Sequence, residues 1–246
     1  MISLTGFNVR FTPKWGMSLL AVFALLLFTR LGFWQLQRAE EKKEMLATHH
    51  ELAKQAPMLW QPGNGRPAQY QQIKVQGHFL SRPLLLDNQH YQHQFGYHVI
   101  SPLILANGNV LLVDRGWLAG DVTRQTLPKI DQPVGLMNVV GSAYYPSAKI
   151  LSLGPMIEKE QADLVVIEVI NTQLISQFLH KSVYPFIMRL GRYETGGYVR
   201  EWAIVSMPPQ RHYAYALQWF AMAFVIFILF IALNLTIKKT HENCSA

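Results

Sequence analysis

Two long apolar segments, one near each end of the chain, limit its fold more than any other feature of the sequence. Residues 213–237 are almost wholly apolar, and a helix needs about 20 such residues to cross the hydrocarbon core of a bilayer. Residues 15–34 form a second apolar segment. Arg30 interrupts it, and its long side chain is able to reach the membrane interface. The sequence therefore predicts a membrane protein in which two transmembrane helices flank one long loop.

The first apolar segment has a second interpretation, because a short apolar core near the N-terminus is also typical of a signal peptide. No small-x-small cleavage pattern follows Arg30, so an uncleaved anchor is favoured, with both termini on the same side of the membrane. The expected division of the chain is a tail (1–14), a transmembrane helix (15–34), a helical stalk (35–55), a β-rich domain (56–208), a second transmembrane helix with an interfacial first turn (209–237) and a second tail (238–246).

Charge does not decide which side of the membrane the loop occupies. Lysine and arginine are enriched on the cytoplasmic side of membrane spans, and here both sides carry them in similar number. The flanking basic residues are Arg10, Lys14, Lys238 and Lys239 at the terminal ends, and Arg38, Lys42, Lys43, Arg200 and Arg211 at the loop ends. The orientation stays open on this evidence.

The overall charge points to membranes or acidic proteins as partners. The formal net charge is +7, but the loop has no basic run and no basic–aromatic alternation of the kind that binds nucleic acid. We therefore expect contact with membrane lipid and no nucleic-acid partner. The single cysteine, Cys244, lies in the last residues of the chain, which excludes an intramolecular disulfide and a thiolate metal site within the loop.

The loop reads as a small β-rich domain after a helical stalk. Its expected strands are Tyr70–His78, Pro83–Asn88, Tyr97–Leu105, Asn109–Trp117, Met137–Tyr144, Leu164–Glu168 and Trp202–Ser206. Asn107-Gly108 favours a primed turn in a tight hairpin, and Asn171 is a candidate cap for one short helix, Asn171–His180. Short strands with turn signals and one helix predict a mainly antiparallel α+β domain, either a small barrel or a sandwich.

The second apolar segment begins with a polar cluster that suits a cofactor ligand. Pro209 favours a helix start at that position, which puts His212 in the first turn at the membrane surface. Tyr215 and Trp219 follow His212 at helical spacing, and Arg211 shares a neighbouring face. One interpretation makes His212 an axial ligand for haem iron. The other makes the cluster an aromatic and basic belt of the kind common at bilayer interfaces.

The loop itself carries no recognisable catalytic motif, so we expect no enzyme activity. His90, His93 and His98 suggest a metal site, but an exposed polar loop is the favoured interpretation. Asp114 and Arg115 suggest either a catalytic pair or, preferably, a structural ion pair beside a buried Trp117.

Several short motifs in a fixed order resemble a known family. They are Gly32-Phe33-Trp34-Gln35-Leu36-Gln37-Arg38-Ala39, Gly77-His78-Phe79, Leu86-Asp87-Asn88, Gly96-Tyr97, Ser101-Pro102-Leu103, Asp114-Arg115-Gly116-Trp117 and Arg211-His212-x-x-Tyr215-Ala216-Leu217-Gln218-Trp219-Phe220. Their order is similar to that of the Surfeit locus protein one family, which assists assembly of haem–copper cytochrome c oxidase. Asp114 stands where that family usually has asparagine, and the tract between residues 118 and 200 matches less clearly.

The resemblance implies an orientation and a cofactor. It implies a bacterial inner-membrane protein with cytoplasmic termini and a periplasmic domain. It also implies binding of haem A and its insertion into oxidase subunit I, with the haem A synthesis machinery as a further partner. His212 takes the position of the family's proposed iron ligand. From the chemistry of the side chains we add Arg211 as a partner for a haem propionate, and Tyr215 and Trp219 as contacts of the haem face.

Transfer of haem requires that the site release it, so we expect a single, exchangeable axial ligand from this chain. Two alternatives stay open. The protein could act as a scaffold for oxidase subunits without binding haem, or as an extracytoplasmic ligand-binding sensor, which would need a convergent polar pocket in the loop.

Overall fold

The chain forms two separate units, a helix unit and a barrel unit. The computed structural model describes residues 9–146, 157–160 and 164–237. The helix unit takes both ends of the chain, up to Ala47 and from Ile204 onward, and the barrel unit is Thr48–Ala203. Cys244 and the tail 238–246 lie outside the described residues.

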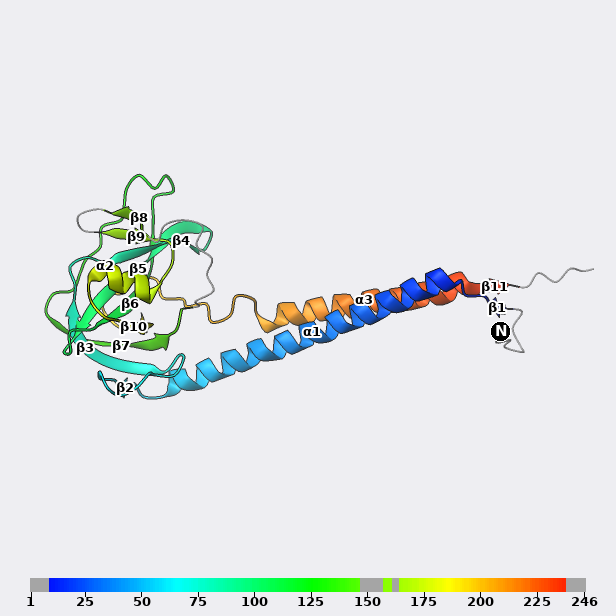
Figure 1. Ribbon diagram of the computed structural model, residues 1–246, viewed down its shortest axis with the longest axis horizontal. Coiled ribbons are helices and arrows are strands. Elements are labelled where there is room, and N and C mark those ends of the chain that lie inside the picture. The colour runs from blue at the N-terminus through cyan, green and yellow to red at the C-terminus, as the bar shows by residue number, and fades with distance from the viewer. Residues whose placement is uncertain (1–8, 147–156, 161–163, 238–246) are drawn as a thin grey trace, which may run out of the picture. The chain divides into compact units, whose positions relative to one another are not determined.

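The helix unit contains the two expected long helices, α1 (Trp15–Lys54) and α3 (Pro209–Asn234) (Figure 1). Both are long and apolar enough to cross a membrane, and most of their large apolar side chains are exposed, as lipid contact requires. Pro209 begins α3, as predicted. Strand β1 (Val9–Phe11) pairs antiparallel with β11 (Leu235–Ile237), so both outer ends of the helices lie together.

The predicted helical stalk after residue 34 continues α1 without a break. Ion pairs one turn apart support it, and they are Arg38–Glu41, Lys43–Glu40 and Lys54–Glu51. The Lys43 pKa is raised, chiefly by its hydrogen bond to Glu40. Each pair is exposed to solvent, so its contribution to helix stability is small.

The barrel unit is built around one mixed sheet. Its elements are β2 (Met58–Leu59), β3 (Gln72–Phe79), β4 (Leu84–Tyr91), β5 (Gln94–Leu105), β6 (Val110–Ala119), β7 (Leu136–Tyr144), β8 (Ile157–Glu160), β9 (Val165–Ile167), α2 (Thr172–Leu179) and β10 (Val183–Leu190). The strand order is β2-β3-β7-β10-β6-β5-β4-β9-β8, and β3 also pairs with β5. That extra pairing closes β3, β7, β10, β6 and β5 into a barrel, which decides between the two predicted architectures.

Two apolar layers hold the barrel together. The inward-facing residues of its strands form a core that includes Trp60, Leu111, Val113, Phe186 and Met188. The outward-facing residues pack under α2 and β9 in a second layer, whose members are Leu84, Ile100, Val110, Leu112, Val165, Ile167, Ile175 and Ile187. At the seam, Gly77 leaves room that β5 fills, since a Cβ there would lie 2.5 Å from the Ile104 carbonyl oxygen.

The structure corrects several local predictions. Trp202–Ser206 is not a strand. Strand β10 was not predicted, because Pro185 interrupts its pattern, and the pairing with β6 shifts register at that point. Strands β10 and β6 run parallel, so the sheet is mixed.

The two hairpin turns also differ from expectation. Gly108 has φ +80° but Asn107 does not have a positive φ, so the hairpin is present without the predicted primed turn. The two central residues with positive φ occur instead at Gln92 and His93, between β4 and β5. The predicted cap is confirmed, since the Asn171 side chain accepts from the backbone N–H groups of Gln173 and Leu174.

Candidate functional site

His212 lies between the two long helices and contacts a buried amide on α1. Its Nδ1 atom is 2.8 Å from Oε1 of Gln35, and Gln35 is only 9% exposed. The other ring nitrogen, Nε2, is buried and has no hydrogen-bond partner among the described residues. Because Gln35 Oε1 is an acceptor, it favours the tautomer with hydrogen on Nδ1, which leaves the Nε2 lone pair available.

This arrangement matches the way that proteins prepare a histidine for a metal. A ligating histidine almost always donates its second N–H to a carbonyl, carboxylate or water, and this bond fixes the ring orientation. Gln35 supplies such an acceptor, and Nε2 keeps a lone pair without a partner among the described residues. Access to Nε2 requires movement of the side chains that cover it, since the atom is not exposed.

Aromatic side chains continue the same interface along the helices. Trp219 stacks on Phe28 with ring centroids 5.6 Å apart, and its Nε1 is also buried without a partner among the described residues. Phe220 meets Phe33 edge-on and fills the space over Gly32, where a Cβ would lie 2.6 Å from the Phe220 ring. Small residues at Gly32 and Ala216 thus allow the close packing typical of membrane helices.

The structure brings together only two of the four predicted site residues. His212 and Trp219 both face α1, whereas Tyr215 is 43% exposed and Arg211 is exposed in the first turn of α3. The buried side of α3 follows positions 212, 216, 219 and 223, so Tyr215 lies beside this row and not within it. Gln35, to which sequence reasoning gave no role, is the residue that contacts the histidine.

The three histidines proposed as a metal site do not converge. His90 is exposed and meets the Phe95 ring, and His93 is exposed in the turn. His98 instead lies 3.0 Å from Asp114, through Nδ1, with Trp202 beside its ring. Among the described residues there is no group of three histidine, cysteine or acidic side chains arranged to hold a metal.

The predicted ion pair between Asp114 and Arg115 is wrong, because neighbouring strand residues point to opposite faces. Asp114 points outward to His98 and accepts from the Gly116 N–H. Arg115 points inward and donates to the Gly196 carbonyl, 2.7 Å away, and to Gln132 Oε1. Burial lowers the pKa of Arg115, and nearby Tyr198 and Asp131 partly offset that effect.

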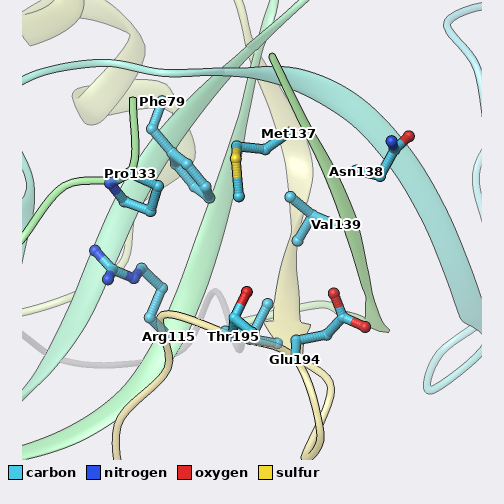
Figure 2. A pocket seen from close by; sticks show the side chains of 9 residues that line it. Phe79, Arg115, Pro133, Met137, Asn138, Val139, Glu194 and Thr195 are labelled. Carbon is cyan, nitrogen blue, oxygen red and sulfur yellow. The ribbon is translucent and has the colours of Figure 1, made fainter. Parts of the chain in front are cut away.

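A small cavity adjoins Arg115 at one end of the barrel. Figure 2 shows Arg115, Phe79, Pro133, Asn138 and Thr195 among the side chains around it. The cavity has a volume of about 20 Å³, which is enough for one water molecule and far too small for a macrocycle. This cavity does not supply the pocket that a small-molecule sensor would need.

Comparison with known proteins then identifies the family. The family model for the SURF1 family matches residues 22–224, a range that includes α1 from its second turn, the whole barrel unit and the His212 region of α3. The chain belongs to the SURF1 family. Membership indicates a role in the assembly of cytochrome c oxidase, and the family consists of assembly factors and not of known enzymes.

Individual SURF1-like proteins are similar at low identity. The chain is 32% identical to a SURF1-like protein of Rickettsia bellii over 150 residues, which cover 58% of each chain. It is 25% identical to one of Rickettsia conorii over 82% of this chain and 84% of that protein. A third, of Rickettsia prowazekii, is 23% identical over 86% of this chain and 87% of that protein.

Proposed function

We propose that this SURF1-family protein binds haem A through His212 and promotes its insertion into subunit I of a haem–copper cytochrome c oxidase. The observation that carries the proposal is the buried, unpartnered Nε2 of His212, with Nδ1 held by Gln35. A neutral histidine with one nitrogen fixed is prepared to bind iron through the other.

The proposal gives the remaining residues of the helix unit distinct roles. Trp219 lies on the same face as His212 and would contact the haem ring. Arg211 is exposed in the first turn, where its guanidinium would pair with a propionate. Tyr215 lies on the exposed side of α3. It would therefore contact haem only when haem lies outside the interface between α1 and α3.

The helix unit also supports single ligation. Between residues 9 and 47 and between 204 and 237, His212 is the only histidine. One exchangeable ligand suits a protein that must release haem. Weaker binding shows mainly as faster dissociation, so a singly ligated haem leaves sooner. Two strong histidine ligands contributed by one purified chain would contradict this feature of the proposal.

The proposed setting is the bacterial inner membrane, with both termini cytoplasmic and the barrel unit in the periplasm. Pairing of β1 with β11 supports a common side for the two termini. The proposed partners are oxidase subunit I, the haem A synthesis machinery and membrane lipid.

The test is the visible spectrum of detergent-purified protein made in cells that synthesise haem A, with identification of the extracted haem. Native protein is expected to carry haem A, and His212→Ala protein to lack it. Tyr213→Phe is the matched control on the same helix turn, because Tyr213 is exposed and has no part in the proposed haem site. Equal haem content in the native and His212→Ala proteins would show that His212 is not the ligand.

One observation favours a second function. The His212–Gln35 hydrogen bond also joins α1 to α3, and such bonds stabilise membrane helix pairs by about 1 kcal/mol. A scaffold that assembles oxidase subunits without haem would need this contact only for packing. Colourless native protein that still associates with subunit I would support the scaffold over the haem carrier.

A further inference from the structure

A guanidinium on the outer face of the barrel has buried nitrogens without partners. Arg189 follows Ile187 on the outward side of β10, just beyond the apolar layer under α2. Its Nε and Nη1 atoms are buried and have no hydrogen-bond partner among the described residues. Buried donors of a charged group are costly to leave unpaired, and such atoms in a native fold call for a ligand, ion or water.

Two aromatic rings lie against the Arg189 guanidinium. Its Cζ atom lies 3.5 Å from the Tyr144 ring centroid and 5.2 Å from that of Trp202. These contacts hold the planar group in place through cation–π attraction, but rings offer no acceptor in the guanidinium plane. Trp202 belongs to a segment without helix or strand, and its ring also contacts that of His98.

The carboxylate nearest to Arg189 by strand register is already engaged. Asp114 is the direct partner of Arg189 across the parallel pair β10–β6. No ion pair joins the two side chains among the described residues. The Asp114 oxygens instead contact His98 Nδ1, at 3.0 and 3.1 Å, and the Gly116 N–H. Within the described part of the chain Arg189 therefore has no bidentate acid partner, although two of its nitrogens are buried.

The positive charge of Arg189 also affects the pKa of His49 in the same unit. His49 meets Tyr70 edge-on, 5.1 Å between centroids, and Tyr70 in turn lies 6.4 Å from Tyr144. Burial lowers the pKa of His49, and the charge of Arg189 lowers it further. Tyr70 has φ +68°, a conformation that is rare for a bulky residue and that marks a locally strained surface.

We infer that Arg189 anchors a binding site for an oxyanion, the carboxylate or phosphate group of a small amphiphilic molecule. The guanidinium supplies in-plane donors that match such a group. Tyr144 and Trp202 supply apolar faces for the body of the same molecule. The site belongs wholly to the barrel unit and is distinct from His212, so it does not depend on haem ligation.

The experiment measures binding to the full-length protein in a neutral detergent by titration calorimetry, with three probes. The probes are inorganic phosphate, metal-free protoporphyrin with its two carboxylates, and phosphatidylglycerol presented in nanodiscs against phosphatidylcholine. Metal-free porphyrin avoids iron ligation, so the His212→Ala protein is expected to bind it as native protein does. Loss of haem in that variant together with retained porphyrin binding separates the two sites.

Arg189→Gln is expected to weaken binding of at least one probe by about tenfold or more, as loss of a charge-assisted pair does. Arg192→Gln is the matched control, because Arg192 is exposed nearby and the change in net charge is identical. Arg189→Lys keeps the charge without the planar fork and is expected to give an intermediate loss. It also serves if Arg189→Gln fails to fold.

The probe whose binding depends on Arg189 identifies the source of the oxyanion. Porphyrin binding that disappears in its dimethyl ester points to a macrocycle carboxylate, and a preference for phosphatidylglycerol points to a lipid headgroup. Binding of inorganic phosphate without binding of porphyrin or lipid would contradict the proposal that the ligand is amphiphilic. Absence of Arg189-dependent binding for all three probes would overturn the site.

Discussion

Two histidines in the two units make opposite use of the same ring. His212 in the helix unit holds its Nδ1 against the neutral amide of Gln35 and has a buried, unpartnered Nε2. His98 in the barrel unit holds its Nδ1 against the carboxylate of Asp114, forming an ion pair when protonated, with Trp202 beside the ring. Either oxygen can accept from an Nδ1–H group, so the difference lies at the other ring nitrogen: Nε2 of His212 is buried and has no partner among the described residues.

The comparison shows that a nearby oxygen alone does not make a metal site. His98 and Asp114 join neighbouring strands, and Asp114 also accepts from the Gly116 N–H, so the pair forms part of the barrel's structure. Gln35 and His212 join two helices whose outer surfaces are apolar, where an unpaired ring nitrogen has few ways to be satisfied. The proposed haem ligation is therefore assigned to the unpartnered Nε2 of His212, whereas the His98 pair joins strands of the barrel.

The largest expected effect is a loss of stability when the partner of His98 in the barrel unit is removed. Asp114→Ala removes the acceptor of His98 Nδ1 and of the Gly116 N–H, so we expect the free energy of unfolding to fall by about 3 kcal/mol. Asp114→Asn keeps one acceptor oxygen and is expected to cost roughly 1 kcal/mol. Thermal and denaturant unfolding measure both. If folded Asp114→Ala protein loses its haem, the distinction between the two histidines is wrong.

The next effect tests the packing that places Gln35 beside His212. Gly32→Leu forces the Phe220 ring out of the helix interface, because even a Cβ would lie 2.6 Å from it. Overpacking of this kind costs about 1–3 kcal/mol, and haem content is expected to fall with helix association. Gly16→Leu is the control, since nothing lies within 4 Å of a Cβ at Gly16 on the same helix. Equal behaviour of the two variants would contradict the role of close packing.

A smaller effect isolates the hydrogen bond to His212. Gln35→Leu removes the acceptor of Nδ1 and is expected to lower haem affinity by about tenfold, as loss of an outer-shell partner commonly does. Gln35→Glu restores an acceptor at the same place and is expected to keep haem bound. Haem titration of purified protein measures both affinities. If Gln35→Leu and native protein bind haem equally, Gln35 serves packing only.

The smallest effect concerns His49 and the charge of Arg189. In Arg189→Gln protein the pKa of His49 is expected to rise, and it stays below the ordinary histidine value because burial persists. In native protein this depressed pKa means that the unfolded chain binds the proton more readily, so stability falls as pH drops below about 6.5. Ring-proton titration by NMR measures the shift. An unchanged His49 pKa would show that the two groups do not interact.

Much of the fold could be predicted from composition and pattern. Long apolar runs with Pro209 at the start of the second are local signals, and α1 and α3 follow them. Asn171 likewise caps α2 through bonds to residues two and three positions on. Turn chemistry misled the prediction at Asn107-Gly108, because the turn runs from Leu105 to Gly108 and only Gly108 takes a positive φ in it. Strand β10 was not predicted because it contains Pro185. The structure accommodates this proline with a register shift between Val183 and Ile187.

The sequence by itself determined the two apolar helices, the position of His212 in the first turn of α3 and the β-rich character of the loop. These depend on contacts between near neighbours in the chain. Tertiary structure alone decided that Gln35 meets His212, that Asp114 pairs with His98 and not with Arg115, and that β3 closes onto β5. Each of these contacts joins residues that are distant in the chain or separated by the alternation of a strand, and no local pattern records them.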